Sequence, residues 1–335
     1  MKTTVASSRE QGSSLLEVVI ALSLTLLVAT SAFLFLQSGQ SALAREPEVA
    51  DMQANVRSAL TRVSADLTVA GVGTPSEMAV LWHDGLGSGP DEITILYADS
   101  EAPIARPQPC ASACDPIGSS SSLTLDPWSL SPAPADYESA YAPGKTLLAL
   151  QSALAGPECS GARPALVSFE LAAGARCTGA SGGTSGAEGC GTLMLSHGPV
   201  RKTLGARLPA GFDSEVNPAC AFVGVFHVIQ YRLSSGELER RDLFQGEDFR
   251  PVAANIEDFQ FQYMQGFEGQ FLDAPSAFPS AFNPTTWLTA VRFTIVGASG
   301  DESHLRRSLS TTVTLRNQLG QASMTPTETA SVSWN

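Results

Sequence analysis

A long apolar segment near the N-terminus, containing a single acidic residue, constrains this chain more than any other feature. Residues 15–36 form a run of 22 residues in which Glu17 is the one charged side chain. About 20 apolar residues are enough to cross a bilayer as a helix. An ionised carboxylate at membrane depth costs roughly 2.5–3.5 kcal/mol on insertion scales, so Glu17 is expected to have a partner.

Two ordinary interpretations of this segment compete with a specialised one. A secretory signal peptide has an apolar core of about 7–15 residues and a small-residue cleavage site, which residues 29–31 would provide. However, the apolar pattern resumes at residues 33–36, and a signal core does not favour Glu17. A plain single-pass anchor explains the length. Neither interpretation explains why Glu17 follows Gly12 by five residues.

The polar leader 1–12, the Gly12–Ser13 junction and Glu17 at the fifth position beyond it resemble the class III signal of type IV prepilins and type II secretion pseudopilins. The resemblance implies that a prepilin peptidase cuts between Gly12 and Ser13 and leaves the apolar segment on the mature protein. It also implies that Glu17 pairs with the new N-terminal amine of a neighbouring subunit in a helical filament. Ser13 stands where the family most often has phenylalanine, a departure that bears on N-methylation of Ser13 rather than on cleavage.

Helical periodicity continues beyond the apolar segment. Apolar residues recur in steps of three and four over residues 52–70, and Asp51, Asn55, Arg62 and Asp66 fall on or near the opposite face. Gly71, Gly73 and Pro75 then end the pattern. One helix over residues 13–70 would be about 87 Å long, and Pro47 is expected to bend or interrupt it. We expect its first half in the membrane and its second half against a globular head. A short coiled-coil stalk is the alternative.

Beyond residue 75 the sequence predicts short β-strands between turn clusters. The expected strands cover residues 78–83, 92–98, 146–151, 166–171, 192–196, 221–233, 237–244, 252–263, 287–296 and 308–317. Residues 101–143 are rich in Pro, Ser and Ala, and residues 172–191 are rich in Gly and Ala. Both stretches are interpreted as long loops rather than framework.

Several short segments, one at the end of the N-terminal helix and the others in the head, resemble PilW-type minor pilins and the related minor pseudopilin J of type II secretion. They lie at residues 57–71, 231–240, 255–263, 291–293 and 315–317. The resemblance implies an α+β, type IV pilin-like fold, with a long N-terminal helix packed on an antiparallel β-sheet head. Its parts would be the leader 1–12, the membrane and filament-core helix 13–36, the amphipathic half 37–75 and the β-rich head 76–335.

Cysteine content favours disulfides over a metal site. The six cysteines are Cys110, Cys114, Cys159, Cys177, Cys190 and Cys220. Zinc sites favour closely spaced Cys pairs with His partners, a spacing not found here, whereas an even count in an exported domain fits disulfides. Six cysteines allow 15 connectivities. Cys110–Cys114 and Cys177–Cys190 are the two local bridges that the spacing suggests, which leaves Cys159 with Cys220 by elimination.

Charge and motifs exclude several functions. The chain of 335 residues has a formal net charge of −13, which argues against a nucleic-acid partner and suits an extracytoplasmic protein. Residues 84–92 intersperse glycines with residues whose side chains carry oxygen atoms, but they lack the residue order of a calcium-binding EF-hand loop. The sequence contains no phosphate-binding loop of the Walker type. We therefore expect no enzyme, cofactor or metal site.

Paired charges in the head are interpreted as solvated or edge residues. The carboxylate pairs Asp213/Glu215, Asp242/Glu247 and Glu257/Asp258 are expected at the surface of so acidic a chain. The arginine pairs 240–241 and 306–307 are expected to face outward and to protect strand edges.

The sequence as a whole predicts a minor pilin-like structural subunit of a type IV pilus that primes assembly or lies near its tip. The expected partners are the prepilin peptidase, other minor and major pilins through the N-terminal helix, and the inner-membrane assembly platform. The expected location is the bacterial inner membrane, with one span and a periplasmic head, followed by the extracytoplasmic filament. The alternatives are a minor pseudopilin of a type II secretion system and a membrane-tethered binding or enzymatic head.

Overall fold

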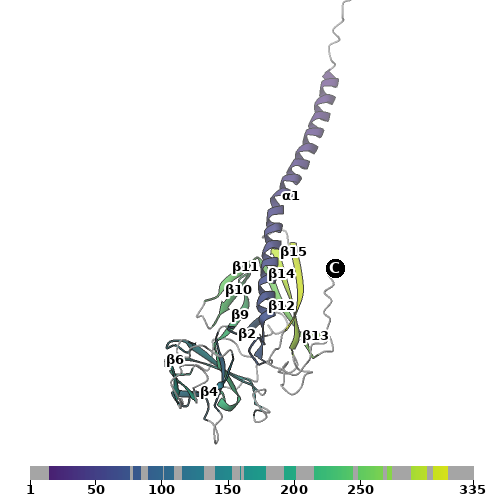
Figure 1. Ribbon diagram of the computed structural model, residues 1–335. Coiled ribbons are helices and arrows are strands. Elements are labelled where there is room, and N and C mark those ends of the chain that lie inside the picture. Colours follow the sequence, from purple (N-terminus) through teal and green to yellow (C-terminus); the bar gives the residue numbers. More distant parts are fainter. Residues whose placement is uncertain are drawn as a thin grey trace, which may run out of the picture.

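A computed structural model shows a long N-terminal helix that projects from a β-rich head (Figure 1). The structure describes residues 15–75, 78–83, 90–100, 102–108, 115–131, 140–152, 159, 162–178, 192–200, 215–243, 248–266, 270–273, 288–299 and 305–315. The architecture is α+β with antiparallel sheets, as the sequence predicts.

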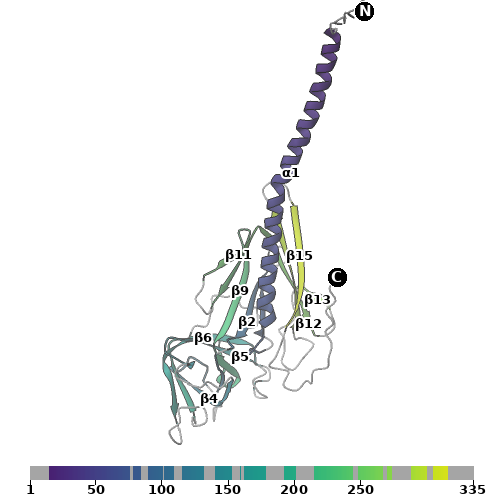
Figure 2. The same ribbon diagram turned by 45° about the horizontal axis from the view of Figure 1, so that its top comes forward.

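Helix α1 spans Leu15–Val69 without interruption, a length of 55 residues. Its first half projects away from the head and its second half packs against it (Figures 1 and 2). The helix continues through Pro47, and its axis changes direction between the two halves. Proline removes one backbone hydrogen bond and crowds the preceding turn, so a bend without a break is its expected effect.

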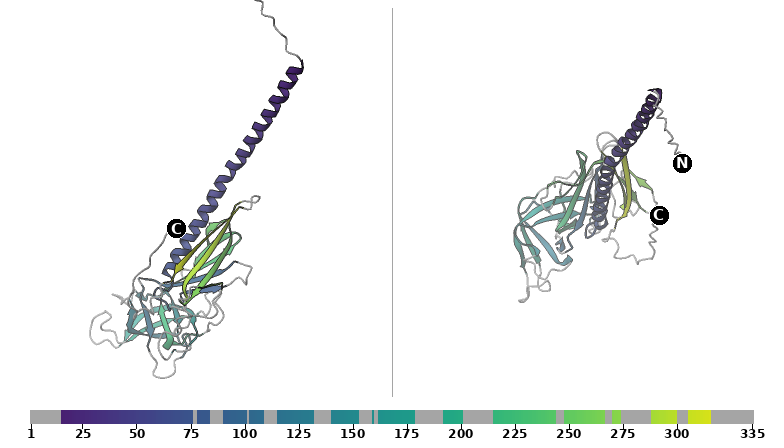
Figure 3. Two further views of the ribbon diagram at one scale, coloured as in Figure 1. Left: turned by 90° about the vertical axis from the view of Figure 1, so that its right-hand side faces the viewer. Right: turned by 90° about the horizontal axis from the view of Figure 1, so that it is seen from above.

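The second half of α1 packs between two antiparallel sheets, one on each side of it (Figures 1 and 3). The five-stranded sheet has the order β1 (Val80–His83), β2 (Glu92–Ala98), β9 (Phe226–Ser234), β10 (Glu237–Asp242) and β11 (Arg250–Ala254). The four-stranded sheet has the order β13 (Phe271–Leu272), β12 (Ile256–Gln265), β14 (Leu288–Ser299) and β15 (Leu305–Thr314).

The apolar stripe of α1 forms one core with both sheets. The periodicity at residues 52–70 is confirmed, because the stripe is buried almost completely. It contacts buried side chains of β2, β9 and β10 in one sheet and of β12 and β14 in the other. The helix members of this core are Met52, Val56, Ala59, Val63, Leu67 and Ala70. Because these residues join the head core, the stalk alternative is wrong.

Residues 252–263 were expected to form one strand, but the chain changes sheets within them. β11 ends at Ala254 and β12 begins at Ile256, in the other sheet. Asn255 between them has a φ of 61°, in the left-handed region that asparagine tolerates better than most residues. This single residue redirects the chain, which a reading of apolar alternation alone does not reveal.

A closed six-stranded barrel is inserted between the hydrogen-bonded neighbours β2 and β9. Its order is β3 (Ile104–Pro107), β4 (Ser122–Ser131), β7 (Thr192–His197), β6 (Ala165–Thr178), β5 (Thr146–Gln151) and β8 (Ala221–Gly224). The strand expected over residues 221–233 is accordingly divided at Val225, with β8 in the barrel and β9 in the sheet. The barrel lies at the end of the head farthest from the start of α1 (Figure 2).

The expectation that residues 101–143 and 172–191 are loops is therefore wrong in part. They contain β3, β4 and the end of β6. Leu123 and Leu125 of β4 are buried and alternate with polar residues, a strand pattern hidden within a Pro- and Ser-rich stretch. Short strands of small residues bury little surface by themselves, and only closure of the barrel gives them partners.

Candidate functional site

The first half of α1 is the surface that most clearly requires a partner. Residues Leu15–Gln40 are long and apolar enough to cross a membrane, and none of this span is buried within the molecule. Exposed large side chains cover it on all sides, among them Leu16, Ile20, Leu27, Phe33 and Phe35. Each of them gains roughly 1.5–3 kcal/mol on leaving water, so the segment is expected to be covered by lipid or by other helices.

Hydroxyl groups within this segment are satisfied by the helix itself. The side chains of Thr25, Thr30 and Ser31 donate to the carbonyl four residues earlier, at 2.7, 2.7 and 2.8 Å. Ser23 donates to the carbonyl of Ile20 at 2.9 Å. Such internal bonds allow a helix to carry Ser and Thr in an apolar surrounding. These bonds were not predicted from the sequence, although a Ser or Thr hydroxyl in a helix can reach the carbonyl four residues earlier.

Glu17 remains the one charged side chain of the span. It lies exposed in the first turn of α1, where the helix dipole favours an acidic group. Within the part of the chain that the structure describes, Glu17 has no ion-pair partner. Gly12 and Ser13 lie outside the described residues. The apolar helix is compatible with a single membrane span, and a signal sequence near the N-terminus can meet the same criteria of length and composition.

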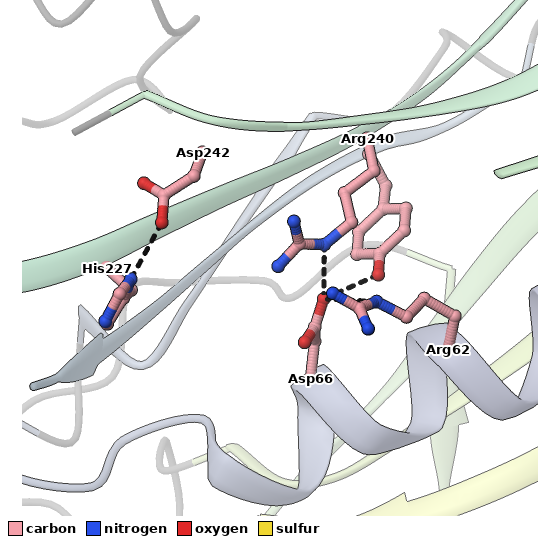
Figure 4. A network of polar contacts seen from close by, with 6 residues as sticks. Arg62, Asp66, His227, Arg240 and Asp242 are labelled. Carbon is pink, nitrogen blue, oxygen red and sulfur yellow. Dashed lines mark hydrogen bonds and ion pairs between the residues drawn. The ribbon is translucent and has the colours of Figure 1, made fainter. Parts of the chain in front are cut away.

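A polar network fixes the second half of α1 to the five-stranded sheet (Figure 4). Asp66 accepts hydrogen bonds from the Tyr231 hydroxyl at 2.6 Å and from Arg240 Nε at 2.8 Å. Arg62 Nε lies 4.0 Å from the same carboxylate oxygen. Only 8% of Asp66 is exposed, whereas the sequence placed it on or near the polar face of the helix. Its position between Val63 and Leu67 is the signal that was missed.

The electrostatics of this network follow from burial and the carboxylate. Burial, and then the charge of Asp66, raise the pKa of Tyr231, so its phenol stays protonated and donates. Burial by itself lowers the pKa of Arg240, but the hydrogen bond and charge of Asp66 outweigh it, and the pKa is raised. The expectation that Arg240 faces outward is wrong, because alternation along β10 turns it toward α1.

A second pair joins β9 to β10. Asp242 Oδ2 lies 2.7 Å from His227 Nδ1, and the Tyr97 ring stacks on the imidazole at 4.8 Å between centroids. The hydrogen bond with Asp242 raises the pKa of His227 against the effect of burial. Asp242 is 3% exposed, so its interpretation as a solvated edge residue is wrong. Tyr97 covers the flat face of the imidazole, an arrangement that suits a structural contact between strands.

Asp91 and Glu92, the last two residues of the segment 84–92, make structural contacts. Asp91 Oδ2 accepts from the Phe261 amide at 2.7 Å, and the Asp91 amide donates to the Phe259 carbonyl at 2.9 Å, so the residue ties the two sheets together. Glu92 accepts from the side-chain amide of Gln230. Residues 84–89 lie outside the described residues. In the ranges that are described, no group of three or more His, Cys, Asp or Glu side chains is placed to hold a metal.

The remaining charge pairs differ in outcome. Glu257 pairs with Arg306 at the surface, as expected for outward-facing residues. Asp258 accepts from its neighbouring amide and from the Gln260 side chain. Asp213 and Glu247 lie outside the described residues.

The structure contains a disulfide between Cys159 and Cys220, the pair that elimination left. It closes a loop of 61 residues and, with Phe222, forms a small core beside β8. Cys177 is also disulfide-bonded. Its expected partner Cys190 lies outside the described residues, as do Cys110 and Cys114.

Among the described residues, the barrel surface includes the following two depressions. One has a volume of about 160 Å³ and is lined by polar groups that include Asp115, Ser119, Ser122, Thr124 and His197. The other, of about 470 Å³, lies beside Glu170 and Gly198 and is open to solvent. Small-molecule sites usually enclose about 300–1,000 Å³, so the first is small and the second is poorly enclosed.

Comparison with protein-family models gives no match, and comparison with curated protein sequences gives none either.

Proposed function

We propose that the chain is a minor subunit of an extracytoplasmic filament, similar to PilW-type minor pilins, and that it assembles through the first half of α1. The observation that carries the proposal is the division of one continuous helix into an exposed apolar half and a half buried in the head core. Removal of the first half as a signal peptide would cut within this helix. A subunit that shares a helical filament core needs both halves joined.

Glu17 gives this assembly its register. Cleavage between Gly12 and Ser13 creates a positively charged amine four residues before Glu17 in the sequence. In an apolar filament core, the carboxylate of one subunit and the amine of its neighbour neutralise one another. Both charges are costly to bury alone, so subunits whose helices are not aligned are penalised.

The head supports the same role. Its two sheets enclose the second half of α1 and leave the first half free, as a pilin-like fold requires. The inserted barrel lies at the far end of the head, where it adds bulk away from the helix that assembles. A bulky distal head fits a subunit that primes assembly or lies near a tip better than one that repeats along a shaft.

Two alternatives have specific discriminators. A minor pseudopilin of a type II secretion system uses the same helix, and the neighbouring genes would distinguish it from a pilus subunit. A membrane-tethered binding head is favoured by one observation, the closed barrel with a core of its own. In that case the head would retain its function when Glu17 is replaced.

The test is incorporation of Glu17→Ala and Glu17→Gln into filaments sheared from the producing cells, measured by immunoblot. Both variants should enter the membrane with a folded head, yet be strongly depleted from the sheared fraction. Ser23→Ala is the matched control, since it removes only a hydroxyl bonded within the helix. Incorporation of Glu17→Ala at the control level would overturn the proposal.

A further inference from the structure

Strand β15 forms an open edge of the four-stranded sheet. Along its ten residues it pairs with β14 on one side, and no strand among the described residues pairs with its other side. Residues 306–310 are exposed on both faces of the strand. An exposed strand edge of this length offers free amides and carbonyls to any other strand, so proteins usually protect or cover it.

Protection by charge is confined to one end of β15. Arg306 and Arg307 occupy its beginning, whereas the seven residues Ser308–Thr314 carry no charge. These seven are Ser, Leu, Thr and Val only, and Thr and Val favour strands. The second part of the edge is therefore left open to pairing.

The apolar, core-facing side of the sheet is also incompletely buried at this edge. Ile295, Phe293 and Val291 of β14 are fully buried, and they lie opposite Leu309, Thr311 and Val313 of β15. Leu309 remains 37% exposed, and Val313 is only partly buried. The rows of side chains that run across the core face, from β14 to β15, therefore end at β15. One more strand would continue them.

The chain itself supplies a matching segment. Residues 316–335 follow Leu315, the last described residue. Within them, the segment Thr329–Trp334 alternates polar residues with Ala330, Val332 and Trp334. This alternation is typical of a strand with one apolar face. Residues 315–328 connect it to β15, and 14 residues are ample for a reversal of direction at about 3.3–3.6 Å per extended residue.

We infer that Thr329–Trp334 adds to the open edge of β15 in the same chain, as an antiparallel fifth strand. Matching the apolar faces places Trp334 beside Leu309 and Ala330 beside Val313. The antiparallel direction places Trp334 toward the end of β15 that carries Arg306 and Arg307. The inference concerns the head alone and does not rest on the proposed function.

Cysteine pairs in the full-length, detergent-solubilised protein test this register. Ser310→Cys and Ser333→Cys would lie directly opposite one another on the outer face, so mild oxidation should link them efficiently. The matched control combines Thr311→Cys with Ser333→Cys, which would point to opposite faces and should link at least tenfold less. Peptide mass spectrometry identifies the bridge. Equal linkage in both variants, or none in the first, would overturn the inference.

A mixture of ¹⁴N- and ¹⁵N-labelled protein distinguishes a strand donated within the chain from one donated by a second copy. Bridges within one isotope class only support the inference, whereas mixed bridges would show a neighbouring copy as donor and contradict it. Truncation after Thr327 gives an independent readout by hydrogen exchange. Amides of Ser308–Thr314 that face the open edge should exchange at least tenfold faster, with β12 unchanged. Unaltered exchange in β15 would contradict the inference.

Discussion

The Tyr231 hydroxyl on β9 donates a 2.6 Å hydrogen bond to Asp66, which lies in the last turn of α1. This contact fixes the rotation of the helix on the sheet. Arg240 reaches the same carboxylate oxygen from β10. Three elements thus meet at one buried oxygen. The network explains how an otherwise apolar helix face adopts a single register.

Removal of Tyr231 or Arg240 should therefore destabilise the docking of α1. Tyr231→Phe should lower the free energy of unfolding by about 1–3 kcal/mol, because Asp66 loses a buried donor. Arg240→Ala should cost at least as much, since it leaves a buried carboxylate short of a cation. Chemical denaturation of the detergent-solubilised protein measures both.

Arg62→Ala is the matched control for this network. Arg62 lies 4.0 Å from Asp66 and its side chain is 53% exposed, so its loss should cost less than about 1 kcal/mol. If Arg62→Ala and Arg240→Ala lowered the free energy of unfolding equally, burial of the arginine would not determine its contribution, which would contradict this account.

His227 gives the head a pH dependence of defined sign. Because Asp242 raises the pKa of His227 above its ordinary value of 6.5, the protonated imidazole stabilises the folded state. This contribution is complete below about pH 6.5 and is lost as pH rises through the folded-state pKa. The difference in unfolding free energy between the unmodified protein and His227→Gln should therefore shrink with rising pH over that interval.

Asp242→Asn removes the charge that raises the pKa of His227 and serves as the control. In that background, the pH dependence due to His227 should weaken or reverse. A difference that grows with pH in the unmodified protein would contradict the assignment.

Gly297 on β14 marks a close approach of α1 to the four-stranded sheet. A Cβ at this position would lie 2.5 Å from Val56 Cγ2 and 3.0 Å from Met52 Cγ. Gly297→Ala should cost about 1–3 kcal/mol through overpacking. Gly39→Ala is the opposite case, because a Cβ there meets nothing within 4 Å and alanine favours a helix. Thermal denaturation should lower the midpoint for the first variant and leave it unchanged or higher for the second.

The second half of α1 is required for a folded head. A fragment that begins at Glu48 should be soluble and β-rich, because Met52, Val56 and Leu67 keep their sheet partners. A fragment that begins at Glu77 loses this stripe, each large side chain of which contributes roughly 1.5–3 kcal/mol. It should aggregate or unfold at lower denaturant concentration. Equal stability of the two fragments, measured by circular dichroism, would contradict the packing described.

Local periodicity predicted most of the framework. Steps of three and four residues identified the buried stripe of α1, and short runs bounded by turn clusters located β2 at 92–98 and β5 at 146–151 to the residue. These features depend on which face of an element is apolar, and that information lies within a few turns of sequence. Pro47 was expected to bend or interrupt the helix, and α1 continues through it without a break.

The barrel and the polar contacts could not be predicted in the same way. Closure of the barrel depends on pairings such as Ala105 with Val223, which are far apart in the sequence. The change of sheet at Asn255 depends on one backbone angle. Asp66, Arg240 and Asp242 were interpreted as surface charges because their partners come from other elements.

Mass spectrometry of the mature N-terminus tests the filament-subunit proposal most directly, since both the Glu17 pairing and the retained helix depend on where the chain begins. The protein isolated from the membrane of its producing cells should begin at Ser13, with or without a methyl group on the new amine. A chain that begins at Thr30 or Ala32 would show that the apolar segment is a signal peptide and would contradict assembly through α1.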